Sequence, residues 1–419
     1  MTEYRLGDLL IIKNGKDHKT LSDGNIPVLG SGGLMRYVNK ALYNGESILL
    51  PRKGSLENIQ YINKPFWTVD TLYYSIVHKE KANAFYLYNY LKKLDLSKLN
   101  SGTGVPSMTF GAYYDVKVHL PDLPTQQKIA SVLSALDNKI ELNNKINAEL
   151  EAMAKTLYDY WFVQFDFPDA VGKPYKSCGG EMVYNEVLKR EIPKGWENGS
   201  LDDLGEIIGG STPPREIQEY FSKTGTAWIT PKDLSKNKGN KFIAHGELDV
   251  SEKGIKNASL RIMPKGTILL STRAPVGYLA ISHDLVTTNQ GFKSFVPNKG
   301  YSSEFTYYTV ENLIPTIENN AVGSTFKEIS ASTLKGIRLC LPDKNVIDDY
   351  NKIIVPIFNK QKLLEKQNQE LASLRDWILP MLMNGQVTVK DAYKRVEEEL
   401  GMVVEGEGVY KRMINLRHV

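Results

Sequence analysis

Two basic loops follow two similar apolar strands, and their side chains have the chemistry to contact nucleic acid. Residues 52–55 read RKGS after the segment ESILLP, and residues 272–275 read TRAP after the segment GTILLS. A guanidinium group can donate two hydrogen bonds to a guanine edge, and lysine or glycine N–H groups can hold phosphates. We therefore expect Arg52, Lys53 and Arg273 to contact DNA.

Further polar residues extend this prediction to other loops of the chain. Gly/Ser/Thr turns at residues 101–104 and 323–325 would let a phosphate backbone approach closely. Taken alone, each candidate is more simply explained as a solvated loop residue, so the prediction depends on their occurrence in equivalent loops. The predicted DNA contacts are Lys13, Asn14, Arg36, Arg52, Lys53, Ser101, Thr103, Thr230, Lys232, Arg273, Asn289, Gln290 and Lys327.

The machinery of a DNA-modifying enzyme is not recognisable in the sequence. NKPF at residues 63–66 departs from the Asn/Asp-Pro-Pro-aromatic motif that grips a target adenine, and no glycine-rich turn for S-adenosylmethionine precedes it. GSGG at residues 30–33 lacks the following Gly-Lys-Ser/Thr of a nucleotide-binding loop. DHK at residues 17–19 lacks the upstream acid of a magnesium nuclease, and the six histidines have no metal-ligand spacing. We predict no catalytic residue, no metal site and no cofactor in this chain.

An internal duplication places the two basic loops at equivalent positions. Residues 136–153 (LDNKIELNNKINAELEAM) and residues 357–374 (IFNKQKLLEKQNQELASL) share seven identities at a constant offset of 221. This is far more than composition alone would give. Ile48-Leu49-Leu50 recurs as Ile268-Leu269-Leu270 at an offset of 220. The chain is therefore read as two copies of one unit, each a lobe followed by a long helix.

The beginnings of the two copies are matched at a shorter offset. Residues 6–8 (LGD) resemble residues 204–206 (LGE) at an offset of 198. The rise of the offset from 198 to 220 indicates extra residues in the second copy. We place them around the lysine-rich segment 231–240. Both lobes are predicted to be rich in β-strands with short helices, because apolar runs end in Gly/Pro loops.

The repeated segments have the period of a coiled coil. Apolar residues recur at heptad spacing, which is typical of a helix that pairs along a narrow seam. Polar residues interrupt this seam at Lys139 and Asn143 in the first helix and at Lys360 and Gln367 in the second. The predicted interface consists of Leu136, Ile146, Leu150, Met153, Leu157, Ile357, Leu364, Leu371, Leu374 and Ile378.

The predicted helices are long enough to act as a spacer. About 35 residues from Gln126 to Tyr160 would form about 50 Å of helix. That exceeds one turn of B-DNA, about 34–36 Å. Period alone leaves open whether the two helices run parallel or antiparallel.

Composition is that of a globular protein with two basic lobes. The 419 residues have a net charge of +4, and only two cysteines argue against disulfides or a cysteine zinc site. Lys and Arg exceed Asp and Glu by 15 to 10 in residues 1–120 and by 13 to 7 in residues 211–299. Two basic regions suit a polyanion. With no signal or membrane-spanning segment recognised, we expect a cytoplasmic protein.

The chain resembles the DNA-specificity subunits of type I restriction–modification systems. The motifs that carry the resemblance are LPDLPTQQKIASVLSALDNKIELNN, KTLYDYWFVQFDFP, GKPYKSCGGEMVYNEVLKREIPKGW and WILPMLMNGQV. They cover nearly the whole chain up to Val389. The second copy, LPDKNVIDDYNKI, lacks the Gln-Gln-Lys-Ile core of the first, so that half is expected to contact its partner differently.

The resemblance implies an α+β fold. Two similar β-rich target-recognition domains would be separated by two long helices forming an antiparallel coiled coil, with an internal pseudo-two-fold repeat. The expected parts are the first recognition domain (1–124), first helix (125–162), linker (163–195), second recognition domain (196–344), second helix (345–385) and C-terminal tail (386–419).

The resemblance also implies partners. Each domain would read one half of a bipartite duplex, and the helices would set the unread gap and dock two methyltransferase subunits. Those subunits methylate adenine using S-adenosylmethionine, and restriction subunits use ATP and magnesium to translocate and cut. Two other hypotheses remain open: a self-contained methyltransferase or nuclease, and a coiled-coil adaptor whose lobes bind no DNA.

Overall fold

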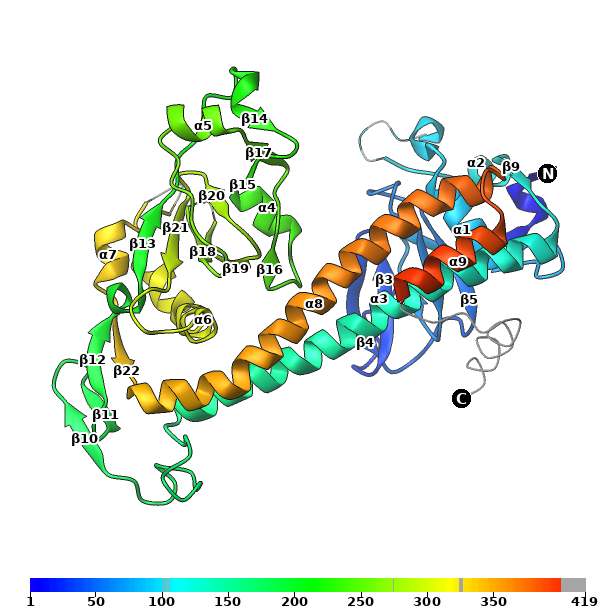
Figure 1. Cartoon of the computed structure of the whole chain (residues 1–419). Coiled ribbons are helices and arrows are strands. Elements are labelled where there is room, and N and C mark those ends of the chain that lie inside the picture. Colours follow the sequence, from blue (N-terminus) through cyan, green and yellow to red (C-terminus); the bar gives the residue numbers. More distant parts are fainter. Residues whose placement is uncertain (101, 103, 105, 274, 324–326, 401–419) are drawn as a thin grey trace. The chain divides into compact units, whose positions relative to one another are not determined.

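The computed structural model describes residues 1–100, 102, 104, 106–273, 275–323 and 327–400 (Figure 1). The chain forms two compact units, the first from residues 1–140 and 370 onward, the second from residues 141–369. The two long helices, α3 (Leu123–Tyr158) and α8 (Lys344–Met383), each contribute one part to each unit. Each unit therefore combines a lobe with a segment of both helices.

The lobe of the first unit is built from small antiparallel sheets. One sheet has the strand order β2-β8-β5-β6, and a second has the order β4-β3-β7 with β3 and β7 parallel. Its elements are β1 (Thr2–Arg5), β2 (Leu10–Lys13), β3 (Ile26–Gly30), β4 (Gly33–Val38), β5 (Glu46–Pro51), β6 (Gln60–Asn63), β7 (Trp67–Thr68), β8 (Leu72–Val77), β9 (Lys117–Leu120), α1 (Ala84–Lys92) and α2 (Phe110–Tyr114).

The lobe of the second unit repeats this plan with additions. The order β13-β21-β18-β19-β16 corresponds to the first sheet, and β14-β17-β15-β20 corresponds to the second, again with one parallel pair. Its elements are β10 (Met182–Asn185), β11 (Arg190–Pro193), β12 (Glu197–Ser200), β13 (Glu206–Gly209), β14 (Phe221–Ser222), β15 (Thr226–Ile229), β16 (Phe242–Ile243), β17 (Leu248–Val250), β18 (Ile268–Thr272), β19 (Val276–Ser282), β20 (Val286–Thr288), β21 (Phe292–Val296), β22 (Arg338–Leu341), α4 (Pro231–Lys236), α5 (Glu252–Asn257), α6 (Ser303–Asn319) and α7 (Ala331–Lys335).

The predicted fold class is confirmed, and local sequence explains the repeated helices. Asn83 and Ser302 cap α1 and α6 by accepting a hydrogen bond from a backbone N–H in the first turn. Thr109 and Ser330 cap α2 and α7 in the same way. Equivalent capping residues therefore start equivalent helices in both copies.

The sequence alignment of the two N-terminal regions was wrong by three residues. Arg5 pairs with Lys117 between β1 and β9, and Ser200 pairs with Arg338 between β12 and β22. Equivalent residues of β9 and β22 are 221 positions apart in the sequence. Equivalent residues of their partner strands, β1 and β12, are 195 positions apart. The match at an offset of 198 followed the Leu-Gly letters, whereas strand pairing decides the true equivalence.

The extra residues of the second copy lie partly where the sequence placed them. Between β15 and β18 the second lobe contains α4, β16, β17 and α5, whereas the first lobe has only β4 between β3 and β5. The lysine-rich segment forms α4, whose first turn is closed by the Thr230 hydroxyl and the Asp233 carboxylate. The insertion therefore extends well beyond the loop that composition suggested.

Hydrogen bonds within each unit show that α3 and α8 run antiparallel. In the first unit, Arg375 Nη1 lies 2.8 Å from Asp137 Oδ1. In the second unit, Gln361 Nε2 donates to Glu151 Oε2 at 2.9 Å. As residue numbers rise along one helix they fall along the other, which settles the direction that period left open.

The helix seam contains a buried polar contact. The Asn143 side chain is fully buried and donates to Gln367 Oε1 and Asn368 Oδ1, both at 2.9 Å. Among the predicted interface residues, Leu136, Leu364, Leu371 and Ile378 are buried, and Ile146, Leu150, Leu157, Ile357 and Leu374 are half-buried. A polar seam position of this kind restricts register and partner.

Two seam predictions are wrong. Met153 is 60% exposed, and the neighbouring Ala154 is buried instead. Lys360 is exposed, whereas Gln361 is buried. The heptad register drifts by one residue at these places because straight helices have 3.6 residues per turn rather than 3.5.

The segment after α3 is a packed part of the second unit. Trp161, Phe162, Phe165 and Phe167 are buried in its core beside Trp196. In the first unit, Leu382 and Met383 at the end of α8 are buried, and α9 (Val389–Leu400) follows them. Ala392 and Val396 of α9 are buried, and Tyr393 donates a hydrogen bond to Ser131. Residues 401–419 of the predicted tail lie outside the described part of the chain.

Candidate nucleic-acid interface

In the first lobe, the loop that carries Arg52 is joined to two other loops by backbone hydrogen bonds. Arg52 and Lys53 both donate N–H bonds to Thr71 O, at 2.9 and 3.3 Å. Met108 N–H donates to Arg52 O at 2.9 Å. The loop after β5 is therefore held between the β7–β8 turn and the segment that precedes α2.

In the second lobe, the loop that carries Arg273 is joined in the same way. Thr272 N–H donates to Gly291 O at 2.7 Å, and Ile329 N–H donates to Thr272 O at 3.2 Å. Thr272 and Gly291 follow Arg52 and Thr71 by 220 residues, and Ile329 follows Met108 by 221. Both lobes therefore present one loop arrangement with an arginine in it.

A further loop joins this set in each lobe through a glycine. A Cβ on Gly15 would lie 2.0 Å from Val69 O, and a Cβ on Gly210 would lie 2.0 Å from Asn289 O. Beside these glycines, Lys16 N–H donates to Thr68 O and Ser211 N–H donates to Thr288 O. Only glycine permits this approach, because any side chain would overlap a backbone oxygen.

Gly210→Ala should open this loop contact in the second lobe. The added methyl group forces the backbone around Asn289 to move, so we expect the free energy of unfolding to fall by about 1–3 kcal/mol. Gly32→Ala is the matched control, because nothing lies within 4 Å of a Cβ there. Urea unfolding of both variants checks the prediction; equal stability of Gly210→Ala and wild type would contradict it.

The two arginines are placed by different neighbours. The Arg52 guanidinium lies 5.9 Å from the centre of the Tyr73 ring, and its Nη1 is 3.4 Å from Asp70 O. The Arg273 side chain is 50% exposed, with Nε 3.8 Å from Glu328 Oε2. A half-exposed ion pair at this distance is weak, so the Arg273 guanidinium is available to a ligand. The Arg52 side chain is half-buried.

Several predicted contacts are engaged within the protein. Arg36 Nη2 lies 2.8 Å from Asp23 Oδ1 and 3.0 Å from Leu21 O. Thr230 caps α4, and Lys232 Nζ lies 2.7 Å from Glu247 Oε2. The Asn289 side chain accepts from Gly291 N–H, and Gln290 accepts a hydrogen bond from Thr212. These residues stabilise their loops in the free protein.

The remaining predicted contacts are surface residues. Lys13, Asn14, Lys53 and Lys327 are exposed. Ser101 and Thr103 lie outside the described residues. Their described neighbours Gly102 and Ser107 both donate N–H bonds to Asn100 Oδ1 at 2.9 Å.

Sequence reasoning missed two exposed cations in these loops. Lys16 follows Gly15, and the Trp67 indole N–H donates to Lys16 O at 2.8 Å. Arg215 lies in the loop after Gly210, with its guanidinium 6.0 Å from the centre of the Trp228 ring. The Trp228 indole N–H fixes that loop by donating to Ser211 O. The signal was the glycine preceding each cation, which the alignment at offset 198 failed to match.

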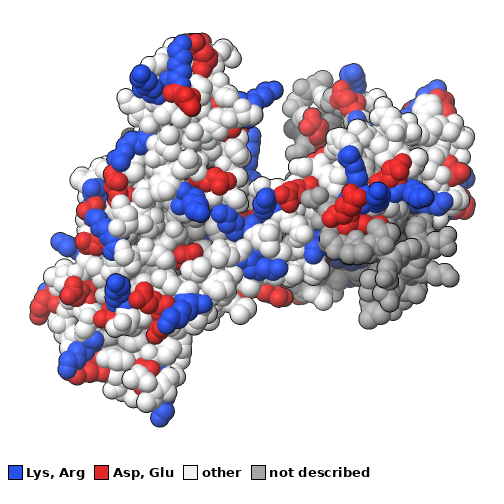
Figure 2. Space-filling view, in the orientation of Figure 1, with Lys and Arg blue, Asp and Glu red and all other residues white. Residues whose placement is uncertain are grey.

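Surface charge on the lobes is mixed. Figure 2 shows Lys and Arg interspersed with Asp and Glu over the visible face. Lys253 and Arg261 lie 2.6 and 2.8 Å from Glu219 and Glu206, respectively. Basic and acidic side chains are therefore mixed on this face, and local loops rather than a broad basic patch are the candidate contacts.

The described residues contain neither a metal-binding group of side chains nor a membrane-spanning helix. Over the described residues, no three His, Cys, Asp or Glu side chains are grouped so that they could hold a metal ion. No helix in the same part of the chain is long and apolar enough to span a membrane.

Known proteins match the chain over most of its length. Residues 1–152 and 193–373 match the family described as type I restriction modification DNA specificity domain. The MjaIX specificity subunit of Methanocaldococcus jannaschii is 38% identical over 49% of this chain, a match that spans 46% of that relative's length. The HindI specificity subunit of Haemophilus influenzae is 29% identical over 70% of this chain and 73% of its own.

A solved structure shares the fold. The crystal structure of a type I restriction–modification S subunit from M. genitalium superposes with a TM-score of 0.62 and 15% identity. The match covers 91% of this chain and 96% of that one. With two matched segments that each comprise a lobe and a long helix, the chain belongs to the family of type I restriction–modification DNA specificity domains.

Proposed function

We propose that the chain is the DNA sequence-recognition subunit of a type I restriction–modification complex and that each lobe reads one half of a bipartite target. The observation that carries this proposal is the repeated loop arrangement around Arg52 and Arg273. Two copies of one reading surface suit two half-sites, because a duplicated contact set needs two places on the duplex to bind. Arg52 and Arg273 would contact base edges, and the exposed lysines would contact phosphates.

The helix pair would supply the spacer between the half-sites. Both helices are regular over most of their length, and α3 and α8 each contribute to both units. The Asn143 contact favours one register over others. A spacer of fixed register would select the number of unread base pairs.

The helices also carry a surface suited to two copies of one partner. Seven residues are identical between the two helices, and four of these in α3 are Asn138, Leu142, Lys145 and Glu149, which are exposed. Their spacing of four, three and four residues places them on one face. Their counterparts on α8, Asn359, Leu363, Lys366 and Glu370, are exposed as well.

Packing between the helices does not account for these identities. Leu142 and Leu363 are 50% and 57% exposed, whereas the buried seam residue Asn143 corresponds to Leu364. Leu150 and Leu371 are an identity within the seam, but the four identities on the exposed face need another reason. We assign this face, Asn138 to Glu149 with its counterparts on α8, to docking of two methyltransferase subunits.

Single charge substitutions should separate the two docking events. Leu142→Glu places a carboxylate at the centre of one face, so we expect one bound methyltransferase subunit instead of two. Leu142→Glu with Leu363→Glu should bind none. The measurement is the stoichiometry of the reconstituted complex by mass photometry.

Ile353→Glu is the control for these variants. Ile353 is 45% exposed on α8, but its counterpart Val132 is buried, so it does not belong to the repeated face. The control should retain two bound subunits. Retention of two subunits by the double variant would contradict the docking assignment.

In this proposal the chain itself has no active site. Partner subunits in the cytoplasm would supply S-adenosylmethionine for adenine methylation, and ATP and magnesium for restriction. This chain would contribute the sequence selectivity of both reactions.

The proposed function is tested by sequencing methylated DNA. The chain would be expressed with its methyltransferase subunit in a host that lacks adenine methylation. We expect methylation at one split motif with a constant gap. Methylation without a split motif would contradict recognition by two lobes.

Salt dependence separates this function from that of an adaptor that binds no DNA. Affinity for duplex DNA should fall steeply between low and moderate salt, because bound phosphates release counterions. Absence of measurable binding at low salt, with the complex assembled, would favour the adaptor.

A further inference from the structure

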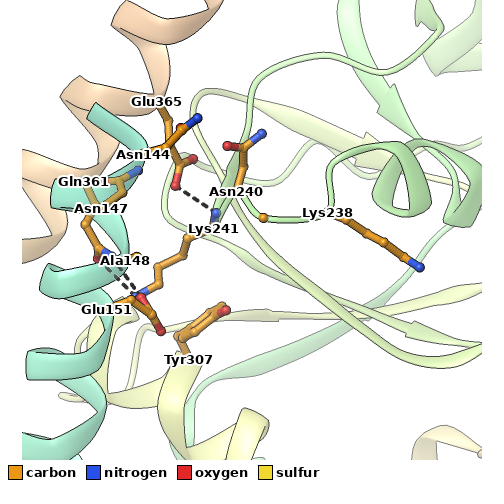
Figure 3. Close-up of a pocket in the computed structure, with 11 residues that line it drawn as sticks. Asn144, Asn147, Ala148, Glu151, Lys238, Asn240, Lys241, Tyr307, Gln361 and Glu365 are labelled. Atoms are coloured by element: carbon orange, nitrogen blue, oxygen red, sulfur yellow. Dashed lines mark hydrogen bonds and ion pairs between the residues drawn. The ribbon is translucent and has the colours of Figure 1, made fainter. Parts of the chain in front are cut away.

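Lys241 lies at the junction between the second lobe and both long helices. It immediately precedes β16, and its side chain is only 4% exposed. Figure 3 shows it directed toward Glu151 of α3 and Gln361 of α8. All of these residues belong to the second unit.

The Lys241 ammonium group contacts three elements at once. Nζ lies 2.5 Å from Glu151 Oε2 on α3, 3.1 Å from Gln361 Oε1 on α8 and 2.8 Å from the Tyr308 hydroxyl on α6. Tyr308 and Gln361 each donate a further hydrogen bond to Glu151, at 3.0 and 2.9 Å. The buried charge therefore has a carboxylate partner and a closed set of hydrogen bonds.

A second carboxylate binds the backbone of the same segment. Glu365 of α8 accepts N–H bonds from Lys241 at Oε1 and from Phe242 at Oε2, both at 2.9 Å. Both oxygens are used, so the start of β16 is fixed in position and direction relative to α8. Burial raises the pKa of Glu365 to about 6 against the opposing effect of these N–H groups. Burial would also raise the pKa of Glu151, but the Lys241 ammonium lowers it.

Apolar packing at this junction is less directional. Phe242 and Phe358 meet edge to face, and a cavity of 570 Å³ lined by Asn144, Lys238 and Tyr307 lies beside the cluster. Apolar contact tolerates small rotations, whereas hydrogen bonds to both oxygens of a carboxylate do not. The polar cluster therefore determines the angle of the lobe on the helices.

The residues of this cluster are not repeated at the corresponding positions of the other copy. At the offset of 221, the counterparts of Glu151, Gln361 and Glu365 are Ala372, Ile140 and Asn144, and Lys241 belongs to the segment added in the second copy. In the first unit the ion pair of Asp137 and Arg375 joins α3 to α8, and its side chains are 33% and 29% exposed. Among the described residues, the lobe-to-helix ion pair with a buried lysine is that of Lys241 and Glu151 in the second unit.

We propose that Lys241, Glu151 and Glu365 are positioning residues that fix the second recognition lobe on the helix pair and thereby set how strictly the complex selects the gap between half-sites. This inference rests on the proposed function. The hydrogen bonds of the cluster join α3, α6, α8 and the start of β16 rather than the loops of Arg52 and Arg273, so it should control spacing without changing the bases read.

Lys241→Met tests the proposal. Reconstituted complexes would methylate duplexes that keep both half-motifs and have the native gap or a gap one base pair longer or shorter. We expect the ratio of rates between native and altered gaps to fall about tenfold in Lys241→Met, because a rotated lobe misplaces its half-site. Selectivity against changes within either half-motif should remain as in wild type.

Lys238→Met is the matched control, because Lys238 is an exposed lysine three residues away that lines the same cavity. It should keep the wild-type gap ratio. Lys241→Met alone leaves the Glu151 carboxylate buried without its partner and could unfold the unit. Lys241→Met combined with Glu151→Met removes both charges, so this double variant is used if the single variant does not fold. A wild-type gap ratio in a folded Lys241 variant would overturn the inference, whereas absence of split-motif methylation by the wild type would overturn the proposed function instead.

Discussion

Four residues inserted into both long helices should lengthen the unread gap of the target and leave the half-motifs unchanged. The insertions belong between Ile140 and Glu141 and between Gln369 and Glu370, where the chain passes from one unit to the other on each helix. Each insertion adds about 6 Å and about 40° of rotation. One base-pair step adds about 3.4 Å, and a full turn takes about 10–10.5 base pairs.

The size of the change in the unread gap shows whether the added length of the helices or their added rotation determines it. If the orientation of the lobe dominates, the gap should grow by one base pair, and if length dominates it should grow by two. Methylation of the native target should fall about a hundredfold, because one half-site is then misplaced. Sequencing of methylated DNA gives the new motif directly.

An insertion of equal length in the turn between β10 and β11 is the control. That hairpin, Met182–Asn185 with Arg190–Pro193, is a local two-stranded sheet in the second unit. The native gap should be retained. A helix-insertion variant with an unchanged gap, or with altered half-motifs, would refute the spacer function.

Arg273→Ala should weaken recognition of one half-motif, and Arg52→Ala should weaken the other. Each arginine lies in the loop after the equivalent strand of its own lobe, β18 or β5, and each side chain is at least partly exposed. Loss of a bidentate contact costs about 1–3 kcal/mol, or roughly 5- to 150-fold in binding. The measurement is the affinity of the complex for duplexes mutated in one half-motif at a time.

The specific signature is relaxed selectivity rather than general weakening. In Arg273→Ala, mutating the affected half-motif should have little further effect, whereas mutating the other half should cost as much as in wild type. Arg338→Ala is the control, because Arg338 is exposed on β22, outside the loop set. Equal loss at both half-motifs in Arg273→Ala would contradict one lobe per half-site.

The duplication could be read from the sequence because it is recorded in identities and local period. The seven identical helix positions and the repeated Ile-Leu-Leu strand located α3, α8, β5 and β18 and placed Arg52 and Arg273 in equivalent loops. Such signals depend on neighbouring residues, which a sequence gives directly. The same reasoning failed at the beginning of the lobes, where the offset is 195 rather than 198 and few letters recur.

Sequence by itself therefore determined the architecture: two β-rich lobes, two long helices and the loops that carry the arginines. Tertiary structure decided what the residue pattern left open: the antiparallel direction, the exposure of Met153 and the polar contact of Asn143 with Gln367. It alone brought Lys241 to Glu365, 124 residues away in the chain. The reason is physical: periodicity reports which face of an element is apolar, whereas the pairing of two polar groups across a fold depends on geometry that no local pattern contains.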